Sequence, residues 1–94
     1  MDDHLPDFRG KVIAVYYMSK SLPDVGALEE PTFERQGGRL FLVGRVPRGV
    51  GEGDWNAGLM TYIAWDCIAE YTVFSSAEEF HRRMGKAPLS RPVH

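Results

Sequence analysis

Residues 28–47, LEEPTFERQGGRLFLVGRVP, contain the pattern that decides the fold. The QGG run at positions 36–38 predicts a tight turn, because glycine adopts the positive φ angles that short hairpin turns require. It separates two strand patterns, at 28–34 and 39–46. Pro31 interrupts the first strand and has no N–H to donate, which predicts an edge position or a bulge. We therefore expect a β-hairpin whose first arm is irregular.

Three further segments on either side of this hairpin read as strands, because β-branched and aromatic residues dominate them without helical spacing. They are residues 10–18, 59–65 and 68–74. The first of them, GKVIAVYYM, is apolar at both alternating sets of positions, which predicts a strand that is covered on both faces. About five short strands in so small a chain predict a strongly bent antiparallel sheet or a small barrel, which leaves few open edges.

The segment SSAEEFHRRMG, residues 75–85, predicts one short C-terminal helix on this mainly β (α+β) fold. Ser76 and Glu79 have the spacing of a capping box, and Ser75 with Glu78 repeats it one position earlier. Acidic residues begin the segment and basic residues end it, which matches the helix dipole. The positions expected to form the buried stripe are Ala77, Phe80 and Met84.

Length and composition predict a single globular domain over residues 1–94, with a core at about 8–85 and loose ends at 1–7 and 86–94. Hydrophobic residues make up 44% of the chain, and the formal net charge of −2 disfavours a dedicated nucleic-acid binder. A single cysteine, Cys67, excludes an internal disulfide. With no leader pattern or long apolar run, we expect a cytoplasmic protein without a membrane association.

The glycine-rich stretch GRVPRGVGEGDWNAG, residues 44–58, superficially matches a dinucleotide-binding loop. Asp54 occupies the position of the third required glycine, and a strand follows where a helix is needed, so a nucleotide cradle is disfavoured. The stretch instead predicts a long connection between two strands. Trp55 either folds back as a lid or stands exposed as a binding anchor, with Arg45 and Arg48 just before it in the chain.

Other candidate groups lack the partners that catalysis requires. Asp66 and Glu70 are two carboxylates near a corner, but no companion arginine, histidine or metal spacing accompanies them. Cys67 has no histidine nearby in the sequence, and His81 belongs to the basic end of the helix. No metal site, cofactor or catalytic residue is therefore expected.

The run GGRLFLVGRVP, the loop tryptophan, and the segments IAWDCIAEYTVF and EEF together resemble small bacterial proteins without an assigned activity. Some of these proteins are encoded as orphan reading frames on mobile elements, and the resemblance covers most of residues 8–84. The expected strand order is also similar to Src-homology-3-like and Sm-like small barrels. The asparagine-bearing and late glycine-bearing strand motifs of Sm-like proteins are absent, so this resemblance implies a fold and no RNA-binding residue.

These observations together predict a non-catalytic binding or assembly module. Self-association as a homodimer is expected, with a second subunit covering Phe41 and Val43, or Ile13 and Tyr17. One alternative is a nucleic-acid binder that stacks bases on Trp55 and Tyr62. Another is a small ligand-binding or enzymatic barrel that uses Asp66 and Glu70. The candidate binding residues are Arg45, Arg48, Asp54, Trp55, Tyr62, Trp65 and Asp66.

Overall fold

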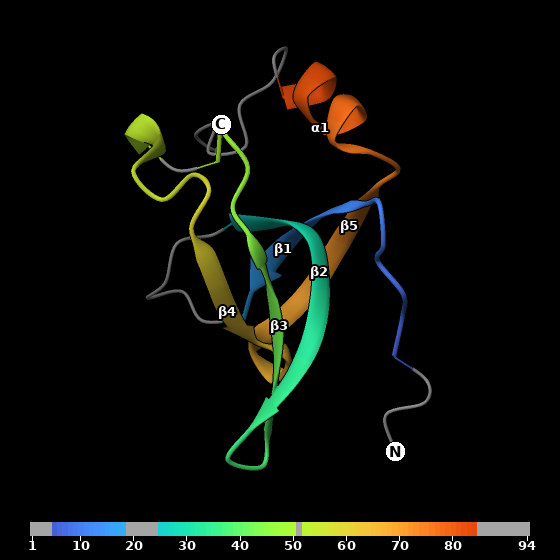
Figure 1. Ribbon diagram of the computed structural model, residues 1–94, viewed down its shortest axis with the longest axis vertical. Coiled ribbons are helices and arrows are strands. Elements are labelled where there is room, and N and C mark those ends of the chain that lie inside the picture. Colours follow the sequence, from blue (N-terminus) through green and yellow to red (C-terminus); the bar gives the residue numbers. More distant parts are fainter. Residues whose placement is uncertain (1–4, 19–24, 51, 85–94) are drawn as a thin grey trace.

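The computed structural model describes residues 5–18, 25–50 and 52–84 (Figure 1). They form one antiparallel sheet of five strands in the order β4-β3-β2-β1-β5, with a single α-helix after the last strand. The sheet is curved and is not closed into a barrel, since β4 and β5 remain its two edges. The prediction of a bent, mainly β fold with one C-terminal helix is confirmed. The elements are β1 (Val12–Tyr17), β2 (Val25–Gln36), β3 (Arg39–Arg45), η1 (Glu52–Asp54), β4 (Met60–Ala64), η2 (Trp65–Cys67), β5 (Ile68–Phe74) and α1 (Ala77–Met84).

The curvature of the sheet is concentrated in β2, which is longer than the predicted 28–34 segment. Its pairing register with β3 shifts between Glu29 and Thr32, so the bulge predicted at Pro31 is confirmed. Within this bulge Glu30 has a φ of 43°, a left-handed conformation that helps to turn the strand. The first half of β2 pairs with β1 and the second half with β3, so one bent strand joins two differently oriented halves of the sheet.

Two hydrophobic cores lie on opposite faces of β1. Ile13 and Val15 belong to the larger core inside the curved sheet, whereas Val12 belongs to a smaller core under the helix. All three side chains are almost completely buried, so the prediction that this strand is covered on both faces is confirmed. The chain itself provides that cover. Ile13 and Val43 therefore need no second subunit to bury them, whereas Tyr17 and Phe41, their partners in the two predicted pairs, are only partly buried.

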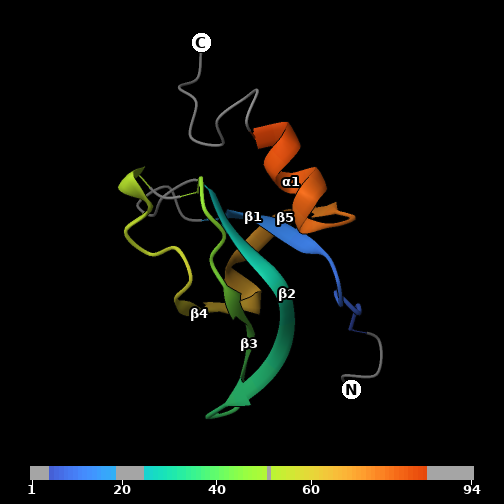
Figure 2. The ribbon, with the colours of Figure 1, turned by 45° about the horizontal axis from the view of Figure 1, so that its top comes forward.

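Helix α1 supplies the cover of the smaller core (Figure 2). The ring of Phe80 is fully buried, and its centroid lies 5.2 Å from that of Phe74 on β5. Met84 packs against the same core, whereas Ala77 is exposed, so the predicted stripe is wrong at that position. Ala77 is the first residue of the helix, and the contact with the sheet begins one turn later. The Oγ of Ser76 accepts a hydrogen bond from the Glu79 N–H at 3.0 Å, as the cap prediction requires.

The three residues of η2 connect the two edge strands of the sheet directly. This short connection brings the end of β4 close to the beginning of β5, and so fixes how far the sheet curls. The sequence predicted β5 at the observed bounds, but it extended β4 to residue 65 and described positions 66–67 as a plain corner. At the other end of the chain Phe8 is buried in the larger core, as expected for a core that begins at residue 8. Residues 1–4 and 85–94, where loose ends were expected, lie outside the described residues.

Candidate binding surface

Large hydrophobic side chains are exposed at seven positions of the described chain, and four of these fall between residues 55 and 62. Trp55 is 74% exposed, the highest fraction in the set. Leu59, Met60 and Tyr62 are each about half exposed. Such a concentration on one short segment marks an interaction surface more often than scattered single residues do.

The pairing of β3 with β4 places part of this group on one face of the sheet. Tyr62 lies opposite Val43, and Met60 lies opposite Arg45. Their neighbours in the strands, Leu42 and Ile63, point into the larger core, so alternation directs Tyr62 and Met60 outward. The Phe41 ring lies on the same outer face, 6.5 Å from the Tyr62 ring and nearly perpendicular to it. Phe41, Met60 and Tyr62 thus share the outer face, and the exposed Trp55 and Leu59 precede β4 in the chain. We call these five residues the β4 surface.

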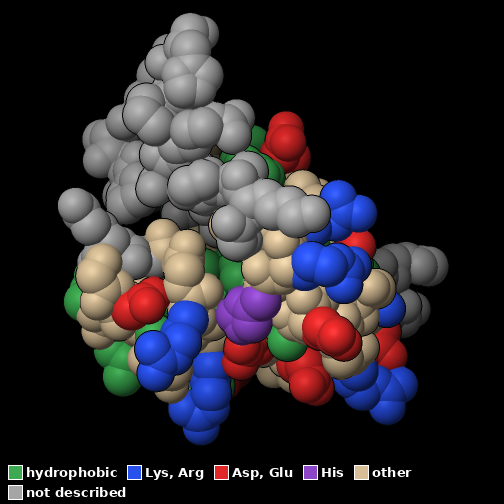
Figure 3. Space-filling view, turned by 90° about the horizontal axis from the view of Figure 1, so that it is seen from above, with side chains coloured by type: hydrophobic (Ala, Val, Ile, Leu, Met, Phe, Trp, Pro, Cys, Tyr) green, Lys and Arg blue, Asp and Glu red, His purple; other side chains and the backbone are tan. Residues whose placement is uncertain are grey.

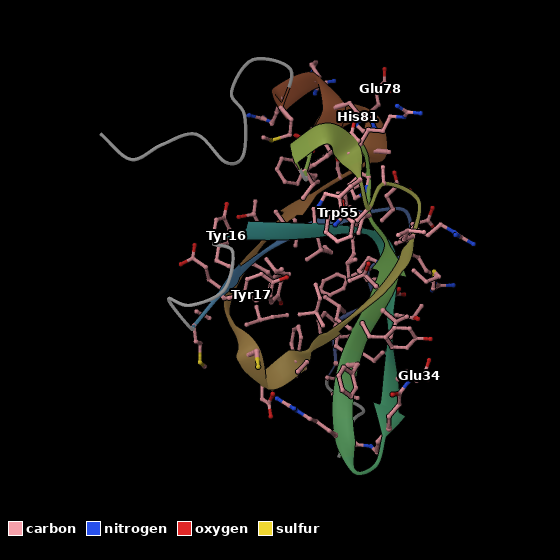
Figure 4. The ribbon with its side chains drawn as sticks, turned by 90° about the vertical axis from the view of Figure 1, so that its left-hand side faces the viewer. Tyr16, Tyr17, Glu34, Trp55, Glu78 and His81 are labelled. Atoms are coloured by element: carbon pink, nitrogen blue, oxygen red, sulfur yellow. The ribbon has the colours of Figure 1, made fainter. Side chains whose placement is uncertain are left out.

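The loop that carries Trp55 is held by hydrogen bonds from its backbone N–H groups to the side chain and the carbonyl oxygen of Asp54. The Oδ1 atom of Asp54 accepts a hydrogen bond from the Gly49 N–H at 2.7 Å. The Asp54 carbonyl oxygen accepts another from the Ala57 N–H at 3.2 Å. Val50 anchors the loop further, because it packs against both hydrophobic cores. Trp55 is thus presented on a folded loop and points away from the sheet interior (Figure 4). The lid alternative loses its physical basis, since a lid would bury this ring.

The two arginines that precede the loop are both exposed. The Nη1 atom of Arg45 donates a hydrogen bond to the Gly58 carbonyl oxygen at 2.9 Å. This contact holds a positive charge where the loop returns to β4, beside Met60. Arg48 lies in the turn at the start of the loop. The structure therefore places Arg45 against the end of the loop that carries Asp54 and Trp55, whereas Tyr62 lies in the middle of β4.

Trp65 is separate from this surface and belongs to a cluster of packed aromatic rings. Its centroid lies 5.0 Å from that of Phe33 and 5.7 Å from that of Tyr71. Phe8 completes the cluster, at 6.1 Å from Phe33 and 5.5 Å from Tyr71. Trp65 is half-buried in contacts with β2 and β5, so it ties the central strand of the sheet to one of its edges. A shallow pocket of about 270 Å³ lies beside it, also lined by Ile68, Ala69, Glu70 and Tyr71.

Asp66 has an ionic partner that the sequence did not reveal. The Nη2 atom of Arg39 lies 3.0 Å from Asp66 Oδ1, and it also donates to the Cys67 Sγ at 3.4 Å. The hydrogen bond from Arg39 lowers the pKa of Asp66, so this carboxylate stays ionised. Acid–base work by two carboxylates needs one whose pKa is raised. Glu70 lines the pocket, whereas Asp66 does not, so the geometry does not combine them into one site.

The sequence interpretation missed two members of the β4 surface and the ionic partner of Asp66. Arg39 is 27 residues from Asp66, and no local pattern indicates that the register of β3 against β4, which pairs Phe41 with Ala64, brings them together. Leu59 and Met60 are the first two residues of the predicted strand 59–65. Apolar residues at that position are expected to be buried, but both are about half exposed. The signal that was available is alternation, because the buried Ile63 fixes Met60 and Tyr62 on the opposite face.

Comparisons of the chain with protein-family models, with curated proteins and with solved structures find no match. The described residues contain no group of three or more histidine, cysteine or acidic side chains placed to hold a metal ion. Within the same residues, no helix is long and apolar enough to cross a membrane. Inferences about function therefore rest on the surface described above.

Proposed function

We propose that this protein is a non-catalytic binding or assembly module that contacts a protein partner through the β4 surface. The observation that carries the proposal is the 74% exposure of Trp55 on a loop whose backbone is hydrogen-bonded. A tryptophan on a folded loop loses little conformational freedom when it is covered, so its burial contributes efficiently to binding. Tryptophan, tyrosine and arginine are the residue types that dominate protein-binding hot spots.

The remaining members of the surface support this choice. Leu59, Met60 and Tyr62 place further apolar area beside the loop, and the Phe41 ring supports Tyr62 from the next strand. Arg45 lies at the rim, where a charged group adds orientation and specificity to an apolar contact. An apolar centre with a charged rim is the ordinary anatomy of a protein–protein interface.

Site-specific photocross-linking in cells tests the proposal. A photoreactive amino acid at position 62 or position 55 is expected to give protein adducts. The matched control is position 73, because Val73 is 45% exposed and lies on β5, at the opposite edge of the sheet. Adducts at 55 and 62 that are absent at 73 support the proposal. Equal yields at all three positions, or no protein adduct at 55 and 62, contradict it.

Nucleic-acid binding is the second candidate, because the exposed Trp55 shares its loop with Arg48. Base stacking on tryptophan next to a cationic side chain is a common mode of single-strand binding. Figure 3 shows Lys and Arg side chains interspersed with Asp and Glu side chains on the face seen from above, so that face lacks a continuous basic field. Affinity for single-stranded DNA that falls steeply with salt, and is lost in Trp55→Ala, would favour this candidate over a protein partner.

A further inference from the structure

We propose that the protein partner of the β4 surface is a second copy of this chain, joined edge to edge along β4 in antiparallel orientation. The inference rests on the proposed function, because it uses the same surface. β4 is an edge of the sheet, and in the described part of the chain only β3 pairs with it. An unpaired strand edge is a template for a strand of another chain. The result is one sheet that runs through both copies.

The hydrogen-bonding phase of β4 determines which residues face the second copy. The Val46 N–H donates to the Leu59 carbonyl oxygen at 3.2 Å, just before the strand begins. In an antiparallel ladder the bonded positions alternate, so the N–H and C=O groups of Met60, Tyr62 and Ala64 point away from β3. The register that pairs all five residues of β4 is then centred on Tyr62. Met60 of one copy pairs with Ala64 of the other, and the two Tyr62 residues face each other.

The side chains fit this register. Met60 and Tyr62 lie on the outer face, so pairing at Tyr62 places these four side chains of the two copies in one apolar row. Directly opposed residues in neighbouring strands have Cβ atoms about 4.5–5.5 Å apart, which allows the two tyrosine rings to contact each other. Leu59 of one copy approaches η2 of the other. Both copies lose exposed apolar area from the segment where most of it is concentrated.

Charge complementarity selects the antiparallel orientation. With Tyr62 at the centre, the Asp66 end of one strand lies beside Gly58 of the second copy. The guanidinium of Arg45 is held at that point, 2.9 Å from the Gly58 carbonyl oxygen. The Asp66 side chain is 68% exposed, so it can contact this arginine while it keeps its pairing with Arg39. The two-fold axis produces this contact twice, whereas a parallel arrangement would place Asp66 beside Asp66.

Charge exchange between two variants tests the arrangement by sedimentation equilibrium. We expect the wild-type chain to dimerise. Arg45→Glu places two acidic side chains at each contact, and Asp66→Lys places two basic ones, so each variant alone should dimerise about tenfold more weakly. An equimolar mixture of the two variants opposes Glu with Lys and Asp with Arg, so it should dimerise as the wild type does. The matched control is Arg82→Glu on α1, which should leave the dimer unchanged, and circular dichroism checks that each variant is folded.

Amide hydrogen exchange on the wild-type chain tests the same arrangement without a substitution. The Tyr62 N–H points away from β3, so its exchange should slow as the protein concentration rises, while the Ile63 N–H should not respond. A monomeric wild type at millimolar concentration, or a mixture that fails to restore the dimer, overturns the inference. If the wild-type chain is monomeric but position 62 still cross-links to a different protein, the proposed dimer is wrong and the proposed function stands. A monomer without adducts overturns the proposed function as well.

Discussion

Asp54 shows how a single residue determines the geometry of the binding loop. It has a φ of 54°, its carboxylate accepts the Gly49 N–H, and its carbonyl oxygen accepts the Ala57 N–H. The sequence assigned Asp54 to the candidate binding residues, and the structure makes it a positioning residue for Trp55. Trp55 itself remained ambiguous in the sequence, since a glycine-rich context does not determine whether a ring is buried.

The exchange Asp54→Ala should therefore loosen the loop without unfolding the domain. The substitution removes the acceptor of the Gly49 N–H. It also leaves alanine, which has no side-chain hydrogen bond to offset the strain, in the left-handed region. Together these changes should reduce the free energy of unfolding by about 1–2 kcal/mol. Asp54→Asn keeps an acceptor and tolerates that conformation, so it is the matched control. Photocross-linking at position 62 should weaken in Asp54→Ala and be retained in Asp54→Asn. Equal yields in both variants would show that the loop geometry does not matter for binding.

The hydrogen bonds of Glu79 at the beginning of α1 should make the stability of the domain fall at acidic pH. Hydrogen bonds from the Ser75 N–H and Ser75 hydroxyl, with a further one from Arg83, lower the pKa of Glu79 from 4.5 to about 2. Because the pKa is lower in the folded state, the stabilisation is complete above pH 4.5 and is lost as the pH falls to about 2. Glu79→Gln should reduce the dependence of unfolding free energy on pH in this interval, measured by urea titration at several pH values. Glu78→Gln removes the same charge from the same turn without touching Ser75, and should keep the wild-type dependence.

At the scale of helices and strands, the sequence predicted the features that neighbouring residues in the chain determine. The glycine turn at 36–38, the bulge at Pro31 and the bounds of β5 follow from backbone preferences and alternation. The full length of β2 and the helical turn η2 were not predictable in this way, because both depend on partners far along the chain. The pairing of Arg39 with Asp66 was missed for the same reason, because it depends on the register of β3 against β4.

The bend of β2 depends on a close approach at Gly44 of β3. A β-carbon at this position would lie 2.9 Å from the Glu29 carbonyl oxygen and 3.2 Å from the Pro31 Cα atom. Since both obstacles are backbone atoms, Gly44→Ala should reduce the free energy of unfolding by about 1–3 kcal/mol, as measured by urea denaturation. Gly26→Ala is the control, because its nearest obstacle is the Tyr17 hydroxyl at the far end of a side chain. A loss that is equal or larger at Gly26 would contradict this account of the bend.

For the molecule as a whole, β1 couples the two hydrophobic cores, since its alternate residues are buried in one or the other. The sheet and α1 should therefore unfold together. Phe80→Ala removes a fully buried ring from the smaller core and should cost about 3–5 kcal/mol, a large part of the roughly 5–15 kcal/mol that stabilises a small domain. The exposed Val73 offers a control, because Val73→Ala on β5 should cost less than about 0.5 kcal/mol.

Two probes in one urea titration decide whether this coupling exists. Far-ultraviolet circular dichroism at 222 nm, a standard helix wavelength, follows α1, and the emission of Trp65 in a Trp55→Phe background follows the aromatic cluster that ties β2 to β5. With one cooperative molecule, Phe80→Ala shifts both midpoints to lower urea by the same amount. If the helical signal alone shifts while the Trp65 midpoint stays in place, α1 is an independent attachment.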